Sequence, residues 1–268
     1  MDICNLRSYG KEPYSTAVIH GGPGAAGDIK VLAEELSKQS GILEPLQTRD
    51  TIEGQLLELY DILIKKDNIP ITLIGHSWGA FLSFLFAGRY PSMVVKLILV
   101  SSPPFEEKYV PYYKMMRLRK LTENEREEVK KIEQQLASDN AGSLNGIFER
   151  FGELMSRSDS YDPIPHENTV LEFRADINKK VWAEAKALRK SGELLSIGKL
   201  IRCPVIAIHG ENDPHPYEGV RDPLSGIIKS FRFILLEKCG HYPWYEKHAR
   251  NSFYKIIFEE LKQGEKIG

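Results

Sequence analysis

Three residues that lie far apart in the sequence, Ser77, Asp213 and His241, could together perform nucleophilic catalysis. A serine hydroxyl is a weak nucleophile near neutral pH, so it needs a base to accept its proton, and the base needs a carboxylate that fixes its tautomer. We therefore expect Ser77 to be the nucleophile, His241 the general base and acid, and Asp213 the orienting carboxylate. Such a set transfers an acyl group through a covalent intermediate.

The surroundings of Ser77 place it on a tight turn. The pentapeptide at 75–79 has the pattern Gly-x-Ser-x-Gly, with an apolar run at 71–74 before it and a run with helical spacing after it. We expect a sharp strand-to-helix turn, in which a Cβ at Gly75 or Gly79 would collide with the adjoining strand and helix. The pentapeptide alone is a short pattern that occurs by chance, but its flanks favour a nucleophile elbow.

A glycine-rich loop at 20–27 follows a strand expected at 14–19. Such a density of glycines indicates that the backbone approaches another group closely. In a hydrolase that group is the oxyanion of the tetrahedral intermediate, which the backbone N–H groups of Gly22 and Trp78 would stabilise. The alternative is a phosphate-binding loop, but the loop has no Gly-Lys-Ser/Thr and does not meet the dinucleotide-binding pattern in register. We expect His20 to hold the loop through its ring.

The elements that must position these groups alternate between strands and helices. This alternation predicts an α/β fold, a doubly wound and mostly parallel sheet whose sites lie at the carboxyl ends of its strands. The glycine loop, Ser77, Asp213 and His241 all follow such ends. The expected strands lie at 14–19, 42–46, 71–74, 94–100, 204–209 and 231–236, and the expected core helices at 29–40, 51–65, after Ser77, and at 248–262.

The composition changes between residues 103 and 195, where the sequence is rich in charge, mostly helical in spacing and without a convincing buried strand. A capping box at Thr122 and Glu125 opens a helix that runs to about 137, and further helices are expected at 143–156 and 178–190. This insertion is longer than a crossover requires. We expect a core formed by 1–102 and 196–268, with 103–195 as a helical lid.

Composition excludes several classes of protein. The 268 residues carry 36 Lys and Arg against 37 Asp and Glu, a net charge of −1, so nothing drives the chain towards nucleic acid or an anionic membrane. No apolar leader or spanning segment is found, and we expect a cytoplasmic protein. Cys4, Cys203 and Cys239 are too scattered for a disulfide framework or a zinc site. We expect no metal, no cofactor and a small-molecule or short-peptide substrate; the oligomeric state stays open.

Together, the motifs at 20–24, 75–79, 210–213 and 240–241 resemble the α/β-hydrolase superfamily, and the first two resemble its proline iminopeptidase branch. The resemblance implies the triad and the oxyanion donors given above, and the resemblance to that branch implies an aminopeptidase. A serine at the elbow argues against dehalogenases and epoxide hydrolases, which carry an aspartate there. One departure is the segment 44–50, which lacks the glycine turn that proline iminopeptidases carry between the glycine loop and the elbow.

An aminopeptidase must also hold the free ammonium group of its substrate, which requires carboxylates. The lid offers four candidates, Glu149, Glu153, Glu167 and Glu172. The histidines that compete with His241 as base are His166, His209 and His215; we expect His209 to be structural, and the other two have no acid in a matching sequence position.

The alternatives to an aminopeptidase are a carboxylesterase or lactonase, or a receptor that binds a small molecule without catalysis. The receptor would be marked by a damaged triad. Here Ser77, Asp213 and His241 all stand in place, so the sequence favours a serine hydrolase that cleaves a small ester or amide bond.

Overall fold

A seven-stranded sheet forms the centre of the protein in the computed structural model, which describes residues 5–66, 69–137 and 144–264. Its strand order is β1-β4-β2-β5-β6-β8-β9. In that order the strands are Leu6–Tyr9, Ile42–Pro45, Thr16–Ile19, Ile71–His76, Val94–Val100, Val205–Gly210 and Phe231–Leu236.

Every neighbouring pair in the sheet is parallel except β1 and β4. The predicted α/β fold with a mostly parallel sheet is therefore confirmed. The central strands β2, β5 and β8 are buried along their whole length because helices cover both of their faces, as in parallel sheets generally. The sequence prediction missed β1, an edge strand that is only partly buried and has no apolar run.

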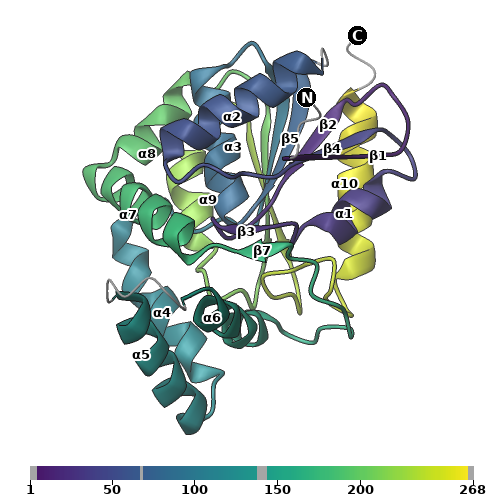
Figure 1. Ribbon diagram of the computed structural model, residues 1–268. Helices are drawn as coiled ribbons and strands as arrows, with labels where there is room; N and C mark the ends of the chain where they lie inside the picture. The colour runs from purple at the N-terminus through teal and green to yellow at the C-terminus, as the bar shows by residue number, and fades with distance from the viewer. Residues whose placement is uncertain (1–4, 67–68, 138–143, 265–268) are drawn as a thin grey trace.

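Two sets of helices cover the sheet (Figure 1). One face carries α1 and α10, and the other carries α2, α3 and α9, with a separate apolar cluster on each face. These helices are α1 (Lys30–Leu36), α2 (Ile52–Lys65), α3 (Trp78–Arg89), α9 (Glu218–Ser225) and α10 (Arg250–Gly264). All but α9 were predicted from apolar spacing, with ends that differ by a few residues.

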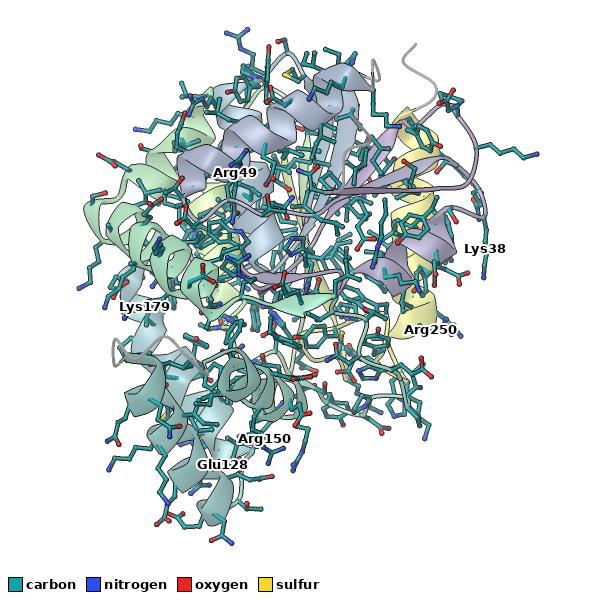
Figure 2. All side chains as sticks on the ribbon, in the orientation of Figure 1. Lys38, Arg49, Glu128, Arg150, Lys179 and Arg250 are labelled. Atoms are coloured by element: carbon teal, nitrogen blue, oxygen red, sulfur yellow. The ribbon has the colours of Figure 1, made fainter. Side chains whose placement is uncertain are left out.

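The helices α4 (Val110–Arg119), α5 (Glu123–Ala137) and α6 (Leu144–Asp159) lie together beyond the end of the sheet (Figure 1). They share a small apolar cluster of their own, which includes Val129 and Leu154. The capping box at the start of α5 is present, because the Thr122 amide donates to Glu125 Oε2 at 2.9 Å and the Glu125 amide to Thr122 Oγ1 at 3.4 Å. Figure 2 shows Glu128 of α5 near Arg150 of α6, whose Nε donates to Glu128 Oε1 at 2.8 Å.

The helix α7 (Ala175–Ser191) packs differently from these three. Its buried residues Ile177, Val181 and Ala185 belong to the same apolar cluster as α3. The short segments α8 (Glu193–Ser196), η1 (Glu107–Tyr109) and η3 (Ile197–Leu200) complete the inserted region and its return to the core. We keep the division into a core and a lid at 103–195 as a proposal, with α4 to α6 as the part of the lid that packs largely on itself.

A second, two-stranded sheet joins the inserted region to the glycine loop. The strand β3 (Ala25–Ala26) pairs antiparallel with β7 (Glu172–Phe173). The Arg174 amide donates to the carbonyl of Gly24 at 2.7 Å, and the Leu171 amide to that of Ala26 at 2.9 Å. The lid segment and the glycine loop are thus held together by their backbones.

Two smaller points concern the cysteines and the membrane. Cys203 and Cys239 are buried free thiols, whereas Cys4 lies outside the described residues. Within the part of the chain that the structure describes, no helix is both long enough and apolar enough to cross a membrane. The cytoplasmic location stays a prediction.

Candidate active site

The turn at Ser77 has the backbone of a nucleophile elbow. Ser77 follows β5 directly and has φ of +51°, a conformation that is strained for a residue with a side chain. Its amide donates to the carbonyl of Val100 at 3.0 Å, which fixes the turn to the neighbouring strand. The structure therefore presents Ser77 at the carboxyl end of the central strand.

The two glycines of the pentapeptide are needed for the reason that the sequence suggested. A Cβ on Gly75 would lie 2.2 Å from the carbonyl oxygen of Gly79, and a Cβ on Gly79 would lie 2.2 Å from that of Ile19. Both obstacles are backbone atoms, which cannot turn away as a side chain can. The predicted crowding is confirmed.

Asp213 and His241 meet at the ends of the next strands. The loop after β8 carries Asp213 and the loop after β9 carries His241, and His241 Nδ1 donates to Asp213 Oδ2 at 2.7 Å. Since the proton is on Nδ1, the Nε2 atom of a neutral ring is free to accept a proton. Both side chains are almost fully buried.

Asp213 and His241 shift the pKa of each other in opposite directions. Burial alone would raise the pKa of Asp213, but its interactions with His241 and His215 outweigh burial and lower the pKa well below its usual value. For His241 burial alone would lower the pKa, and the Asp213 carboxylate outweighs this and raises it. Asp213 is therefore ionised at neutral pH, and its charge makes His241 a stronger base than burial alone would allow.

A second imidazole is bound to the same carboxylate. Asp213 Oδ1 accepts from both the backbone amide and the Nδ1 of His215, each at 2.9 Å, and the ring of His215 stacks on Tyr113 of α4 at 4.6 Å. The interpretation that His215 has no acid in a matching position was wrong, because a residue two positions after an aspartate can fold back onto it. Burial is the largest of several effects on the pKa of His215 and lowers it to about 4. The ring is therefore neutral at pH 7.

The other histidines have structural partners. His209 Nε2 donates to the carbonyl of His215 at 2.9 Å, as expected for a structural residue. His20 accepts from the Gln47 amide at Nε2, at 3.1 Å, and donates from Nδ1 to the carbonyl of Gly21 at 2.7 Å. Its ring therefore ties the glycine loop to the segment after β4, which agrees with the role expected for it.

The candidate oxyanion donors are Trp78, which follows Ser77 in the chain, and Gly22 of the glycine loop. Trp78 is the first residue of α3, so its N–H has no acceptor within the helix. Gly22 has φ of +44° and lines the same cavity as Ser77. The indole of Trp78 is buried, and its Nε1 donates to Gln55 at 2.9 Å, so this side chain supports the turn and does not enter the cavity.

The candidate nucleophile, base and oxyanion loop all line one cavity of about 780 Å³. Its wall includes Ser77, His241, His215 and Gly22 from the core, together with residues of α4, α6 and α7. The volume is that of a site for a small molecule. Asp213, His215 and His241 are also a possible set of metal ligands, with donor atoms within 4.8 Å of one another, but here these atoms bond to each other.

The four lid carboxylates differ in position. Glu153 and Glu167 line the cavity, whereas Glu149 and Glu172 are exposed residues outside its wall. Glu153 is paired with Arg150 at 2.9 Å, and Glu167 is exposed. The structure therefore does not bring the four together into one subsite. The sequence could not show this, because the segment 160–171, which carries Glu167, has no helical or strand periodicity from which a side-chain position could be predicted.

The fold and the elbow define an α/β-hydrolase, and comparison with known proteins agrees. Residues 58–248 match the family described as alpha/beta hydrolase fold, which is more than half of the chain. The chain belongs to this family. The resemblance seen in the sequence is thereby confirmed at the level of the superfamily.

Individual relatives are more distant. A proline iminopeptidase of Heyndrickxia coagulans is 25% identical over 247 residues, which is 86% of this chain and 85% of that protein. A putative lipase from Acinetobacter baumannii has a TM-score of 0.69 and 18% identity over 100% of this chain and 91% of the other. The enol-lactonase from Burkholderia xenovorans has a TM-score of 0.61 and 17% identity over 96% and 95% of the two chains. These structural likenesses show the fold.

The first prediction from this geometry concerns pH. We expect kcat/KM to rise with pH as His241 loses its proton, because only the neutral ring can accept the Ser77 proton. Since the Asp213 carboxylate raises the pKa of His241 despite burial, the half-maximal rate should lie above the ordinary value of about 6.5. Initial rates of p-nitrophenyl acetate hydrolysis between pH 5 and 9 measure it; a midpoint below 6 would contradict the assignment.

The variant His215→Phe gives this measurement a control. Phenylalanine keeps a flat ring beside Tyr113 and the backbone amide that donates to Asp213, but it removes the Nδ1 donor. Asp213 would then interact more strongly with His241, so the midpoint should move to higher pH. An unchanged midpoint would mean that the His215 ring does not influence the pair.

Proposed function

We propose that this chain is a serine hydrolase that cleaves a small ester or amide bond through an acyl-enzyme. The observation that carries the proposal is the convergence of Ser77, the Asp213–His241 pair and the glycine loop on one cavity. The family and the hydrolase names of its relatives support a hydrolytic enzyme.

In the proposed reaction His241 Nε2 removes the proton from Ser77 Oγ as the oxygen attacks the carbonyl carbon of the substrate. The backbone N–H groups of Gly22 and Trp78 would stabilise the oxyanion that forms. His241 then gives the proton to the leaving alkoxide or amine, and the acyl group stays on Ser77. Water, activated by the same imidazole, releases the acid and restores the serine.

Within this class the leading candidate is an aminopeptidase of the proline iminopeptidase type, which the relative at 25% identity favours. The alternative is a carboxylesterase or a lactonase, the activity named for one of the structural neighbours. A non-catalytic receptor is the third candidate. Nothing in the geometry of the Asp213–His241 pair favours it, since the two groups are bonded as a base requires.

A substrate panel separates these candidates. Purified protein would be tested with proline and other aminoacyl naphthylamides beside short and long p-nitrophenyl esters, and labelled with a fluorophosphonate. We expect turnover in at least one class together with labelling of Ser77. Tight binding of ligands without labelling and without turnover would support the receptor and refute the hydrolase.

A further inference from the structure

A carboxylate outside the triad lies in the same cavity, on the core side. Five carboxylates line the cavity wall. Three of them are neutralised by arginines, since Asp159 pairs with Arg117, Glu107 with Arg189 at 2.9 Å and Glu153 with Arg150 at 2.9 Å. The remaining two are Asp28 and Glu167, of which Glu167 is exposed to solvent.

Asp28 is held in place by one of its two oxygens. Its Oδ1 accepts from the amide of Gly21 at 3.1 Å, and the side chain is 17% exposed. Its Oδ2 lies 3.9 Å from Nδ1 of His76, too far for a hydrogen bond. No lysine or arginine pairs with Asp28 among the residues that the structure describes.

His76 cannot neutralise Asp28. Its Nε2 donates to the carbonyl of His241 at 3.0 Å, so Nε2 carries the proton and Nδ1 of the neutral ring is an acceptor. Burial, followed by the charge of His241, lowers the pKa of His76, which keeps the ring neutral. Asp28 Oδ2 therefore faces another acceptor. Among the described residues no side chain neutralises the carboxylate by direct pairing, and the charge of protonated His241 acts on it without an ion pair.

A bound cation would stabilise the charged form of Asp28. Burial, despite the hydrogen bond from Gly21, raises the pKa of Asp28 to about 7, because the charged form is poorly stabilised. Two phenols, Tyr242 and Tyr245, line the same cavity; burial raises the pKa of each, and the charge of Asp28 adds to this, for Tyr242 after that of Asp159. A carboxylate and aromatic rings in one cavity are the chemistry that recognises an ammonium group.

We propose that Asp28, in the cavity that Tyr242 and Tyr245 also line, binds a positively charged amino group of the substrate and so selects acyl compounds that carry a free amine. The inference rests on the proposed function, because it concerns the cavity in which Ser77 would react. It differs from the expectation drawn from the sequence, which placed the ammonium on carboxylates of the lid. The group is on the core, directly after the glycine loop.

The experiment uses two esters that differ only in charge, alanine methyl ester and N-acetylalanine methyl ester, with p-nitrophenyl acetate as a neutral third substrate. Wild type should hydrolyse the free amine at least about tenfold better, in kcat/KM, than its acetylated form. Asp28→Asn should lower kcat/KM for the free amine by about 10- to 100-fold, the range of a lost charged hydrogen bond, mainly through KM. Both neutral esters should change by less than about twofold.

Asparagine is chosen because its carbonyl can still accept from Gly21, which keeps the glycine loop in place. Asp28→Glu, which keeps the charge, should restore part of the preference. Glu34→Gln, an exposed carboxylate on α1 that pairs with Lys30, is the matched control and should behave as wild type.

Three results would overturn the proposal: no preference for the free amine in wild type, loss of all three activities together in Asp28→Asn, or loss of the preference in Glu167→Gln with Asp28→Asn unaffected. The failure of the proposed function looks different. In that case Ser77→Ala would hydrolyse p-nitrophenyl acetate as fast as wild type, whatever the result with Asp28→Asn.

Discussion

The Ser77→Ala variant is expected to hydrolyse p-nitrophenyl acetate about a thousandfold more slowly than wild type, or slower still, while it folds normally. Without the hydroxyl no acyl-enzyme can form, and the remaining rate would come from the oxyanion donors and from binding. The backbone conformation at φ of +51° strains alanine no more than it strains serine, so the elbow should stay intact. Stopped-flow release of p-nitrophenolate would also lose any initial burst.

The matched control for Ser77→Ala is Ser225→Ala. Ser225 is an exposed serine at the end of α9, whose hydroxyl donates only to the local carbonyl of Asp222 at 2.9 Å. It should keep the activity of wild type. Equal rates for Ser77→Ala and wild type would refute Ser77 as the nucleophile.

Asp213→Asn is expected to lower kcat by about 10⁴-fold, as it does where an aspartate orients a catalytic histidine. The structure gives a specific reason. Two donors from His215 point at Oδ1, so an asparagine would turn its carbonyl to them and its NH₂ to His241. His241 Nδ1 would then accept, its proton would move to Nε2, and the ring could no longer take a proton from Ser77.

Two observations test this reason for the Asp213→Asn effect. The NMR signals of the His241 ring should report a proton on Nε2 in the variant and on Nδ1 in wild type. Asp222→Asn, at an exposed carboxylate on α9 that pairs with Arg221, should leave the rate unchanged. A loss of less than tenfold in Asp213→Asn would show that Asp213 does not orient the base.

Much of the core could be predicted from the sequence because local signals there agree with the tertiary structure. The strands β2, β5, β6 and β8 are almost entirely buried and consist largely of aliphatic and β-branched residues, so each can be recognised without its partner strands. The pentapeptide around Ser77 adds a turn whose glycines have one physical explanation. Position at a strand end then places the loops that carry Asp213 and His241 at the same edge of the sheet.

The parts that could not be predicted depend on contacts that form only where the chain folds back on itself. His215 reaches Asp213 because the loop after β8 curls, which no periodicity reports. The helix α4 was missed since its apolar residues, such as Met115 and Leu118, are exposed and form no stripe. Asp28 had one signal, its position directly after the glycine loop, but only the three-dimensional structure shows that no lysine or arginine among the described residues pairs with it.

The pairing of β3 with β7 has a mechanical consequence. Gly24 lies so close to the inserted region that a Cβ there would sit 2.2 Å from the carbonyl oxygen of Arg174, and Asn178 of α7 donates to the carbonyl of Pro23 at 3.1 Å. Any displacement of the segment 171–178 must therefore pull on the loop that carries Gly22. In the proposed mechanism, a movement that opens the cavity at this segment would therefore also move the Gly22 donor.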